Sequence, residues 1–543
     1  MNPNSILTVN PSAWPQYPFN EPPTGGERSE PRYSIFPEYD LRITMRDGVR
    51  LAADVFRPWA PGEKFPALIG YSPYTRQLQH TLTPIGQNES GLTEFWVPRG
   101  YAHVIVDVRG SNDSEGAWDY RGSVEQQDLA EVIAWAASQP WCNGNVGMTG
   151  CSYFSVSQVL VACSQQPPAL KAIFPYDAYT DQYRSCSFHG GIPADGFMRI
   201  WFSDVAYLNL WGGRLKEPAG LHHHFRTVLG HKFPLEGAYW RDRSSDHRLD
   251  RIKIPAYFGC DWPFFNLHLP GAFRGWEATT GIPKRMLIGP HPHPRRPFAV
   301  YHQEALRWYD HWLKGMDTRV MEGAPIQLYI QGDDTWRSEW EWPLARTEWR
   351  DMFLGGPAGG REGRLLEIAG QDGERSYTYD PSSDAAWIGQ PNLVYRSEPM
   401  AKPLEITGPI VLHLVAHSTA TDTDWFVILA DEAPDGGVTI LTRGWLRSSH
   451  REVDPARSTP YRPYRPHARQ IPLVPRQPET VPIEIIPTCN VFKPGHRIRL
   501  EVASSDNMVD NPFWYHRALA IPADNTVLEG KAGSRLMLPI IPR

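Results

Sequence analysis

The nine residues Gly147-Met148-Thr149-Gly150-Cys151-Ser152-Tyr153-Phe154-Ser155 constrain the fold of this chain more than any other stretch. A short apolar approach through Val146 precedes them, and apolar spacing predicts a helix from Val156 onward. Glycines at a strand-to-helix turn permit a tight, strained bend that pushes one side chain outward. Here that side chain is Ser152, whose hydroxyl would lie over a helix N-terminus, where amides favour a developing negative charge. This is the geometry of a nucleophile elbow, although Gly-x-Ser alone is equally consistent with a simple turn.

Apolar runs and a helical pattern alternate on both sides of this turn. Phe65–Tyr71 and Tyr101–Val108 are nearly all apolar, as expected of strands covered on both faces. Val124–Ser138 has helical spacing, and Leu170–Pro175 predicts a further strand. Strand, helix, strand, elbow, helix and strand form an α/β pattern with a mainly parallel sheet, in which ligands bind at the carboxyl ends of the strands.

Polar side chains follow several of these strand ends, and we expect them to face one crevice. Tyr74, Ser152 and Asp177 each come after a predicted strand, and two later strands end shortly before Asp261 and His293. A serine nucleophile needs a general base, and an imidazole base needs a carboxylate to fix its tautomer. Because α/β hydrolases carry the three groups in the order Ser, acid, His, the sequence predicts a triad of Ser152, Asp261 and His293.

The remaining chain predicts further parts around the α/β core. Between Asp177 and about Leu249 the alternation gives way to aromatics, glycines and short helical patches, which indicates an inserted helical cap. Beyond Gly315 short strands with turn signals, Ile326–Ile330 among them, indicate an all-β sandwich of jelly-roll size. The predicted parts are an arm (1–30), the first part of the α/β domain (31–176), the cap (177–249), the second part of the α/β domain (250–316) and the sandwich (317–543).

Composition excludes several classes of protein. At 543 residues the chain is too long for a single core, and its net charge of -6 argues against nucleic-acid binding or a polybasic membrane signal. Six scattered cysteines form neither a disulfide framework nor a zinc site. No secretion signal and no membrane-spanning apolar run is recognisable, so we expect a cytoplasmic protein.

Short motifs spread over most of the chain resemble those of one family. They are Arg46-Asp47-Gly48-Val49, Ser72-Pro73-Tyr74, Asp107-Val108-Arg109-Gly110, Gly150-Cys151-Ser152-Tyr153, Gly289-Pro290-His291-Pro292-His293, Trp308-Tyr309-Asp310-His311-Trp312-Leu313-Lys314-Gly315 and Gly332-Asp333-Asp334-Thr335-Trp336. Together they resemble the cocaine esterase and α-amino-acid ester hydrolase group of serine hydrolases, the CocE/NonD type, which is related to X-Pro dipeptidyl-peptidases. The resemblance implies an α/β hydrolase fold with an inserted helical cap and a C-terminal all-β jelly-roll domain, and no metal or organic cofactor.

The resemblance also implies roles for individual residues. Ser152 would be the nucleophile and His293 the general base, with the Tyr153 N–H and the Tyr74 hydroxyl forming the oxyanion hole. The spacing Gly-Pro-x-x-His selects His293 over His291. For the acid, relatives often carry Gly-Trp-Tyr-Asp, whereas Asp261 followed by Trp262 resembles the form in the X-Pro branch; Asp177 is the alternative. Ser155 stands where many relatives have glycine, so we expect some crowding between the helix and the sheet there.

The predicted reaction is a two-step acyl transfer that cleaves an ester or amide of a small molecule. We expect Trp262, Phe264 and Phe265 to line an apolar acyl pocket, with Asp177 among the carboxylates available to hold an α-ammonium group. An acyltransferase or cyclase that uses the same acyl-enzyme is the nearest alternative, and an inactive carbohydrate-binding protein is another.

Partners other than a small substrate are not specified by the sequence. It predicts no nucleic-acid or membrane partner and is compatible with a homo-oligomer. Pro460–His467 has the pattern of a polyproline-type segment, which either docks a partner or packs on the sandwich.

Overall fold

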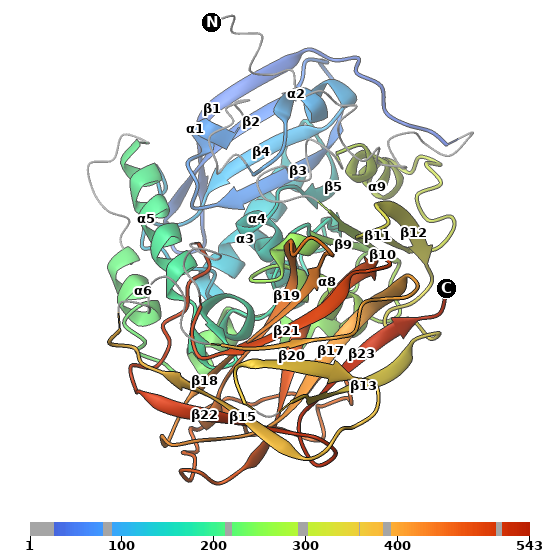
Figure 1. Cartoon of the computed structure of the whole chain (residues 1–543). Coiled ribbons are helices and arrows are strands. Elements are labelled where there is room, and N and C mark those ends of the chain that lie inside the picture. Colours follow the sequence, from blue (N-terminus) through green and yellow to red (C-terminus); the bar gives the residue numbers. More distant parts are fainter. Residues whose placement is uncertain are drawn as a thin grey trace, which may run out of the picture.

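The computed structural model describes residues 26–79, 89–211, 220–290, 302–357, 359–383, 392–506 and 513–543. In Figure 1 an α/β part lies above a β-rich part, with the helices of residues 195–228 along one side of both. No helix in these ranges is long and apolar enough to cross a membrane.

The first sheet of the α/β part has the strand order β1-β2-β4-β3-β5-β6. Its strands are β1 (Ile35–Thr44), β2 (Arg50–Pro58), β3 (Phe65–Ser72), β4 (Ala102–Asp107), β5 (Cys142–Met148) and β6 (Leu170–Ala172). β1 and β2 form an antiparallel hairpin, whose turn requires Gly48 at a φ of 84°. β3 pairs in parallel with β4 and β5, and all eight of its residues are buried, as its apolar run predicts.

A second sheet continues the first. It contains β9 (Ala256–Asp261), β10 (Lys284–Gly289), β11 (Ile326–Ile330) and β12 (Thr335–Glu339), in the order β12-β11-β10-β9. Parallel bridges from Ile173 to Ala256 and from Tyr176 to Gly259 connect it to the end of β6. The carboxyl ends of β5 and β9 therefore lie on the same edge of one extended sheet.

Our placement of Ile326–Ile330 in the β-sandwich is wrong. This strand, β11, runs parallel to β10 and is fully buried within the α/β sheet, and β12 pairs with its other edge. The physical reason is that β10, the following helix and β11 form a βαβ unit, whose two strands pair in parallel. A parallel strand that is covered on both faces is a continuous apolar run, so its sequence does not show which sheet it joins.

Helices cover the faces of this sheet. α3 (Ser123–Ser138) and α4 (Tyr153–Ser164) lie where apolar spacing predicts helices, although α4 begins three residues earlier than predicted. α9 (His302–Lys314) follows β10 in the chain, and α8 (Leu269–Ala278) packs beside β9. Two one-turn helices, α1 (Arg76–Gln79) and α2 (Thr93–Trp96), and a 3-10 turn (Val97–Arg99) follow β3.

The segment between β6 and β9 is rich in helices, as predicted. It contains a π-helical turn (Tyr183–Ser187), the short strands β7 (Phe188–His189) and β8 (Ile192–Pro193), the helices α5 (Asp195–Trp211), α6 (Leu221–Val228) and α7 (Ala238–Asp242), and a 3-10 turn (Asp246–Arg251). Indole and phenyl rings of α5 pack against Trp118 and Tyr120 of the α/β part, so the segment is fixed to the domain beneath it.

The C-terminal part is one β-rich domain. Its strands are β13 (Glu348–Gly355), β14 (Glu362–Leu366), β15 (Gly373–Tyr379), β16 (Leu393–Arg396), β17 (Leu404–Ser418), β18 (Asp424–Glu432), β19 (Val438–Arg447), β20 (Glu479–Phe492), β21 (Arg497–Ala503), β22 (Ala523–Glu529) and β23 (Arg535–Ile541). The sheet closes because β17 pairs with β23 as well as with β20 and β22, and it encloses its own apolar core. Closure removes most exposed strand edges.

Candidate active site

Ser152 lies at a sharp turn between β5 and α4. Its backbone has a φ of 57° and a ψ of -118°, a region that residues other than glycine rarely adopt. Gly150 has a φ of 116°, and a Cβ there would lie 2.4 Å from the Cβ of Phe154. Ser152 is the N-cap of α4, and Tyr153 supplies the first amide of the helix. The turn therefore has the conformation of a nucleophile elbow.

Ser155, where we expect crowding between the helix and the sheet, makes two hydrogen bonds that hold the elbow. Its buried hydroxyl lies 2.7 Å from the carbonyl oxygen of Gly150 and 2.5 Å from that of Tyr176, so one proton is shared between two carbonyl groups. Tyr176 bridges to the strand β9 through Gly259. The hydroxyl thus links the strained turn to the neighbouring strand, which glycine could not do.

Tyr74 follows β3 and contacts the same cavity as Ser152. The indole N–H of Trp201, from α5, donates a hydrogen bond of 2.8 Å to the phenol oxygen. Because the phenol oxygen accepts this bond, its own proton remains available to donate into the cavity. Burial, with the nearby charge of Glu89, raises the pKa of Tyr74 well above its usual value, so the phenol stays protonated.

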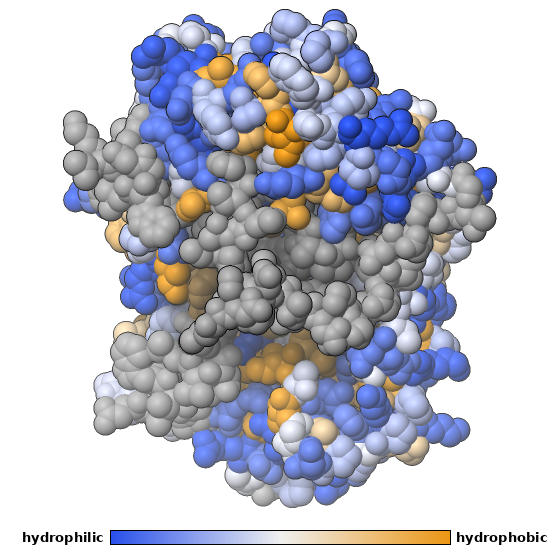
Figure 2. Space-filling view, turned by 90° about the horizontal axis from the view of Figure 1, so that it is seen from above, coloured by the Kyte–Doolittle hydropathy of each residue, from blue (hydrophilic) through white to orange (hydrophobic). Residues whose placement is uncertain are grey.

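A cavity of about 380 Å³ opens at Ser152. Its described walls come from several distant stretches of the chain, and the side chains are mainly aromatic or apolar, with two carboxylates: Tyr74, Glu89, Ser152, Phe197, Ile200, Trp201, Asp204, Pro263, Phe264, Leu267, His268, Phe513 and Trp514. Figure 2, seen from above, shows hydrophobic residues in small groups among mainly hydrophilic ones. The volume suits a small organic ligand.

The two candidate acids lie close together beneath this edge of the sheet. Asp261 ends β9, and Asp177, at a φ of 58°, donates its backbone N–H to the carbonyl oxygen of Gly259 over 2.8 Å. Both side chains are about 1% exposed. Burial, with the charges of Asp177 and Asp261, raises the pKa of the Cys260 thiol between them. His293 and His291 lie outside the described residues.

The predicted acyl pocket is placed only in part. Phe264 lines the cavity at Ser152. Trp262 instead donates its indole N–H to the Tyr329 carbonyl oxygen over 2.7 Å within the core, and Phe265 lines a different cavity. The difference arises because a 3-10 turn follows β9, so successive side chains point in different directions. Asp177 is not among the described residues that line the cavity.

Several cavity residues were not predicted as site residues. Phe197 and Trp201 belong to the aromatic-rich segment that the sequence shows, but their direction depends on the helix α5. His268 is stacked between the rings of Phe264 and Tyr179, with centroids 5.1 Å and 5.7 Å away. Trp514 comes from the C-terminal domain, and no local pattern marks it.

A buried cation packs against the ring of Tyr153 and lines a small cavity beside Ser152. The guanidinium of Arg121 lies over the rings of Tyr153, Tyr120 and Tyr179, at 4.5, 4.6 and 5.1 Å from their centroids. The Tyr153 hydroxyl donates 2.6 Å to Glu125, and burial raises the pKa of Glu125 to about 7. A protonatable carboxyl therefore lies one hydrogen bond from the residue whose amide follows Ser152.

Replacing Glu125 by glutamine should change how stability depends on pH. The folded pKa of about 7 exceeds the ordinary value of 4.5, so the folded protein binds this proton more tightly than the unfolded chain does. Stability contributed by the protonated group is then lost as pH rises from about 4.5 to about 7. Between pH 5 and pH 8 the free energy of unfolding should fall by about 2–3 kcal/mol more in the wild type than in Glu125→Gln. Urea unfolding of both proteins at pH 5 and pH 8 measures these free energies. An equal fall in the wild type and in Glu125→Gln would contradict the prediction.

Comparisons with known proteins agree with this geometry. Residues 47–295 match the family model of the X-Pro dipeptidyl-peptidase (S15 family), and residues 318–532 match that of the X-Pro dipeptidyl-peptidase C-terminal non-catalytic domain. The cocaine esterase of Rhodococcus sp. is 29% identical, over 86% of this chain and 90% of its own. The crystal structure of a CocE/NonD family hydrolase from Staphylococcus aureus superposes with a TM-score of 0.81 at 25% identity, covering 94% of each chain.

The chain is a serine hydrolase whose relatives include members of the CocE/NonD group. An α-amino-acid ester hydrolase shares the fold, with a TM-score of 0.71 at 20% identity over 97% of this chain and all of that one. The hydrolase thus has an α/β-hydrolase domain followed by a β-rich domain, and the relatives favour neither an acyltransferase nor an inactive binding protein.

Proposed function

We propose that this serine hydrolase cleaves an ester or amide of a small molecule through an acyl-enzyme on Ser152. His293, oriented by Asp261, takes the hydroxyl proton as Ser152 attacks the carbonyl carbon, and the imidazolium then protonates the leaving group. The Tyr74 hydroxyl and the Tyr153 N–H donate to the oxyanion. Water, deprotonated by the same imidazole, releases the acid and restores the serine.

One observation carries this proposal: Ser152, at a φ of 57°, and Tyr74 line the same cavity. The Tyr74 oxygen accepts a hydrogen bond from Trp201, so that its own O–H is available as a donor. The strained turn presents the hydroxyl at a helix N-terminus, and the Trp201 indole fixes the phenol oxygen in place. Preorganised donors of this kind stabilise the tetrahedral intermediate more than the ground state.

The described walls favour a bulky apolar acyl group. Phe197, Trp201, Phe264 and Trp514 supply aromatic surface, and Glu89 and Asp204 are the charged side chains among the described residues of this cavity. Apolar walls reward burial of an aryl group, and the carboxylates disfavour an anionic one. We therefore propose that Phe264 belongs to the acyl pocket, together with Phe197, Trp201 and Trp514. These side chains, with Glu89 and Asp204, take the substrate-binding roles expected of Trp262, Phe265 and Asp177.

Kinetics with 4-nitrophenyl esters test the function. A phenylacetyl ester should show a burst of one nitrophenol per active site followed by slower turnover, because acylation precedes deacylation. The same panel should rank phenylacetyl above acetyl and acetyl above succinyl. No ester or anilide hydrolysis above the buffer rate would contradict the proposal.

Replacing Tyr74 by phenylalanine should lower kcat by roughly 10²–10³, the usual effect of one lost oxyanion donor. KM should change little, because the phenol acts on the developing charge. Trp201→Phe tests the orientation of the phenol: it removes the indole N–H that donates to the phenol oxygen, together with part of the aromatic wall, and should lower kcat less than Tyr74→Phe does. Steady-state rates decide this, and a Tyr74→Phe variant within about threefold of wild type would contradict the assignment.

Substitution of each candidate acid separates the two. Asp261→Asn should lower kcat by roughly 10⁴, the loss expected when the imidazole is held in the wrong tautomer. Asp177→Asn should cost much less, since Asp261 ends its strand as the family order requires. If instead Asp177→Asn shows the larger loss, Asp177 is the acid.

The finer architecture belongs to the same proposal. The helices of residues 195–242 would act as a cap, since Phe197 and Trp201 line the cavity, and the closed C-terminal sheet would be a jelly roll. A small ester or amide would be the sole partner needed for the reaction, and the cytoplasmic location stays a prediction from sequence.

A further inference from the structure

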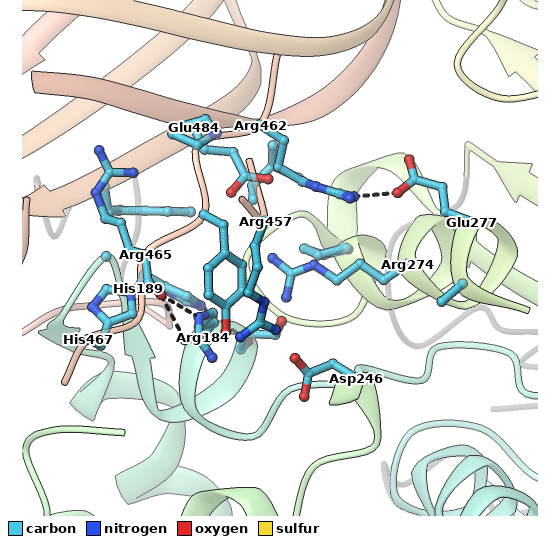
Figure 3. Close-up of a pocket in the computed structure, with 18 of the residues that line it drawn as sticks. Arg184, His189, Asp246, Arg274, Glu277, Arg457, Arg462, Arg465, His467 and Glu484 are labelled. Atoms are coloured by element: carbon cyan, nitrogen blue, oxygen red, sulfur yellow. Dashed lines mark hydrogen bonds and ion pairs between the residues drawn. The ribbon is translucent and has the colours of Figure 1, made fainter. Parts of the chain in front are cut away.

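A second cavity, of about 460 Å³, lies between the α/β part and the C-terminal domain. Its walls come from the π-helical turn at 183–187, from α8, from the segment 457–467 and from β20. Figure 3 shows its charged residues: Arg184, Asp246, Arg274, Glu277, Arg457, Arg462, Arg465 and Glu484, with His189 and His467 beside them. None of its lining residues is shared with the cavity at Ser152 among the described residues.

Some of these charges form ion pairs that build the wall. Arg184 contacts Asp181 at 2.8 Å and Glu236 at 2.5 Å, both just behind the cavity surface. Arg462 pairs with Glu277, which ties the segment 457–467 to α8. These pairs explain the shape of the cavity: Pro460–His467 packs between the two domains and holds its side chains in place.

Two of the guanidinium groups that extend into the cavity are not held closely by carboxylates among the described residues. The nearest carboxylate contact of Arg274 within the described residues is Asp181, at 3.9 Å. Arg457 makes no ion pair within 4 Å there, and its guanidinium lies 3.6 Å from the centroid of the Tyr464 ring. In Figure 3 both groups extend into the middle of the cavity, from α8 and from the segment 457–467. They present hydrogen-bond donors to whatever occupies it.

Two carboxylates in the same wall have no Arg or Lys nitrogen within 4 Å among the described residues, and Arg462 and Arg465 act on Glu484 only from a longer distance. Within the described residues, Glu484 has no ion pair within 4 Å, and Asp246 contacts only the adjacent His247, at 3.6 Å. Figure 3 shows Glu484 and Asp246 on opposite sides of the two central arginines. The cavity therefore offers anionic as well as cationic contacts.

Two buried polar atoms in the wall are further possible contacts for a polar ligand. Ser185 and Arg465 are 2% and 6% exposed, and neither the Ser185 Oγ nor the Arg465 Nε has a hydrogen-bond partner among the described residues. Burial lowers the pKa of Arg465 to about 10. Leaving such groups without partners is costly, so a polar ligand that approached them would be stabilised.

We propose that this cavity binds a small zwitterion, an α-amino acid or a short peptide with free termini. Its carboxylate would lie between Arg274 and Arg457, and its ammonium would face Asp246 or Glu484. Five guanidinium groups are matched by five carboxylates, three in the wall and two directly behind it. A neutral, dipolar ligand suits such a site, because a simple anion or cation would also meet charges of its own sign. Trp445 and Phe265 provide apolar surface for a side chain.

The walls of this cavity continue into those of the cavity at Ser152. Ser185 lines the zwitterion site, and the next residue, Cys186, lines a second, small cavity that Ser152 also lines. Phe265 and Phe264 are divided between the two in the same way. A ligand bound at the proposed site would therefore contact segments that also shape the substrate pocket. Its binding does not require that Ser152 react with a substrate.

Calorimetric titration of Ser152→Ala protein with glycyl-L-phenylalanine tests the proposal without turnover. The dipeptide should bind, and its N-acetyl form and its C-terminal amide should each bind roughly tenfold or more weakly, since each lacks one charged group. Arg457→Gln should weaken the dipeptide and the N-acetyl form but leave the amide unchanged; Asp246→Asn should weaken the dipeptide and the amide but leave the N-acetyl form unchanged.

Arg469→Gln is the matched control, since Arg469 is largely exposed, pairs with Glu452 and lies just beyond the same segment. It should leave every affinity unchanged. Arg457 is itself exposed, so its replacement should not unfold the protein, which a thermal melt confirms. The absence of binding heat, equal affinities for the three peptides, or unchanged binding by Arg457→Gln would overturn the proposal. Binding that survives Arg457→Gln would place the peptide in the cavity at Ser152 instead.

Discussion

Replacing Ser152 by alanine should lower kcat by roughly 10⁶, the loss measured when the nucleophile of a serine hydrolase is removed. The residual rate would come from binding and oxyanion stabilisation alone. Affinity for substrate should be retained, because the hydroxyl contributes one small polar group to a wall built mainly from aromatic side chains. The fold should also survive, since serine at this position makes no side-chain cap to the helix α4. Single-turnover release of nitrophenol, with a thermal melt alongside, measures both effects.

Ser157→Ala provides a matched control for this substitution. Ser157 lies one turn further along α4, and its hydroxyl donates 3.0 Å to the Tyr153 carbonyl oxygen, away from the cavity. It should retain nearly full activity. Retention of more than about 1% of the wild-type rate in Ser152→Ala would show that another group forms the acyl-enzyme.

Replacing His293 by alanine should be almost as damaging, because without a base the serine hydroxyl stays a weak nucleophile. We expect a loss of roughly 10⁶ in kcat, as for the nucleophile. The effects of the two substitutions on kcat should not be additive, since the serine and the histidine act together in the same step. In the wild type, kcat/KM should decline below about pH 6.5, where the imidazole becomes protonated.

Two other histidines serve as controls. His291→Ala should retain activity if the spacing from Gly289 selects the base correctly. His268→Ala addresses the described histidine that lines the cavity beside Ser152. Its ring is stacked between Phe264 and Tyr179, so its loss should alter substrate affinity more than kcat. A loss of activity in His268→Ala or His291→Ala greater than that in His293→Ala would reassign the base.

Much of the α/β sheet could be predicted because its strands carry their own signals. β3 and α3 begin and end within one residue of the predicted ranges, since buried parallel strands read as apolar runs and a helix has a fixed period. The same rule misplaced β11: its strand character is local, but the choice of sheet depends on pairing with β10, which the sequence of the segment does not encode.

The position of Ser152 was predictable for a similar reason. Gly150 and the apolar start of α4 specify a strand-to-helix turn from neighbouring residues alone. The cavity walls were less predictable because they meet through tertiary contacts. Phe264 and Phe265 are adjacent in sequence, yet the turn after β9 directs them into separate cavities. Ser155 is a second example, because its role in holding the elbow depends on a hydrogen bond to the carbonyl group of Tyr176, which is distant in sequence.

Labelling with a fluorophosphonate, followed by peptide mapping, tests most directly whether the strained turn carries an activated alcohol. Such a reagent phosphonylates a serine only where a base removes its proton and donors hold the resulting oxyanion. We predict one label per chain, on the peptide that contains Ser152, absent from Ser152→Ala and formed more slowly in Tyr74→Phe. A label on a different serine, or continued ester hydrolysis by fully unlabelled protein, would contradict it.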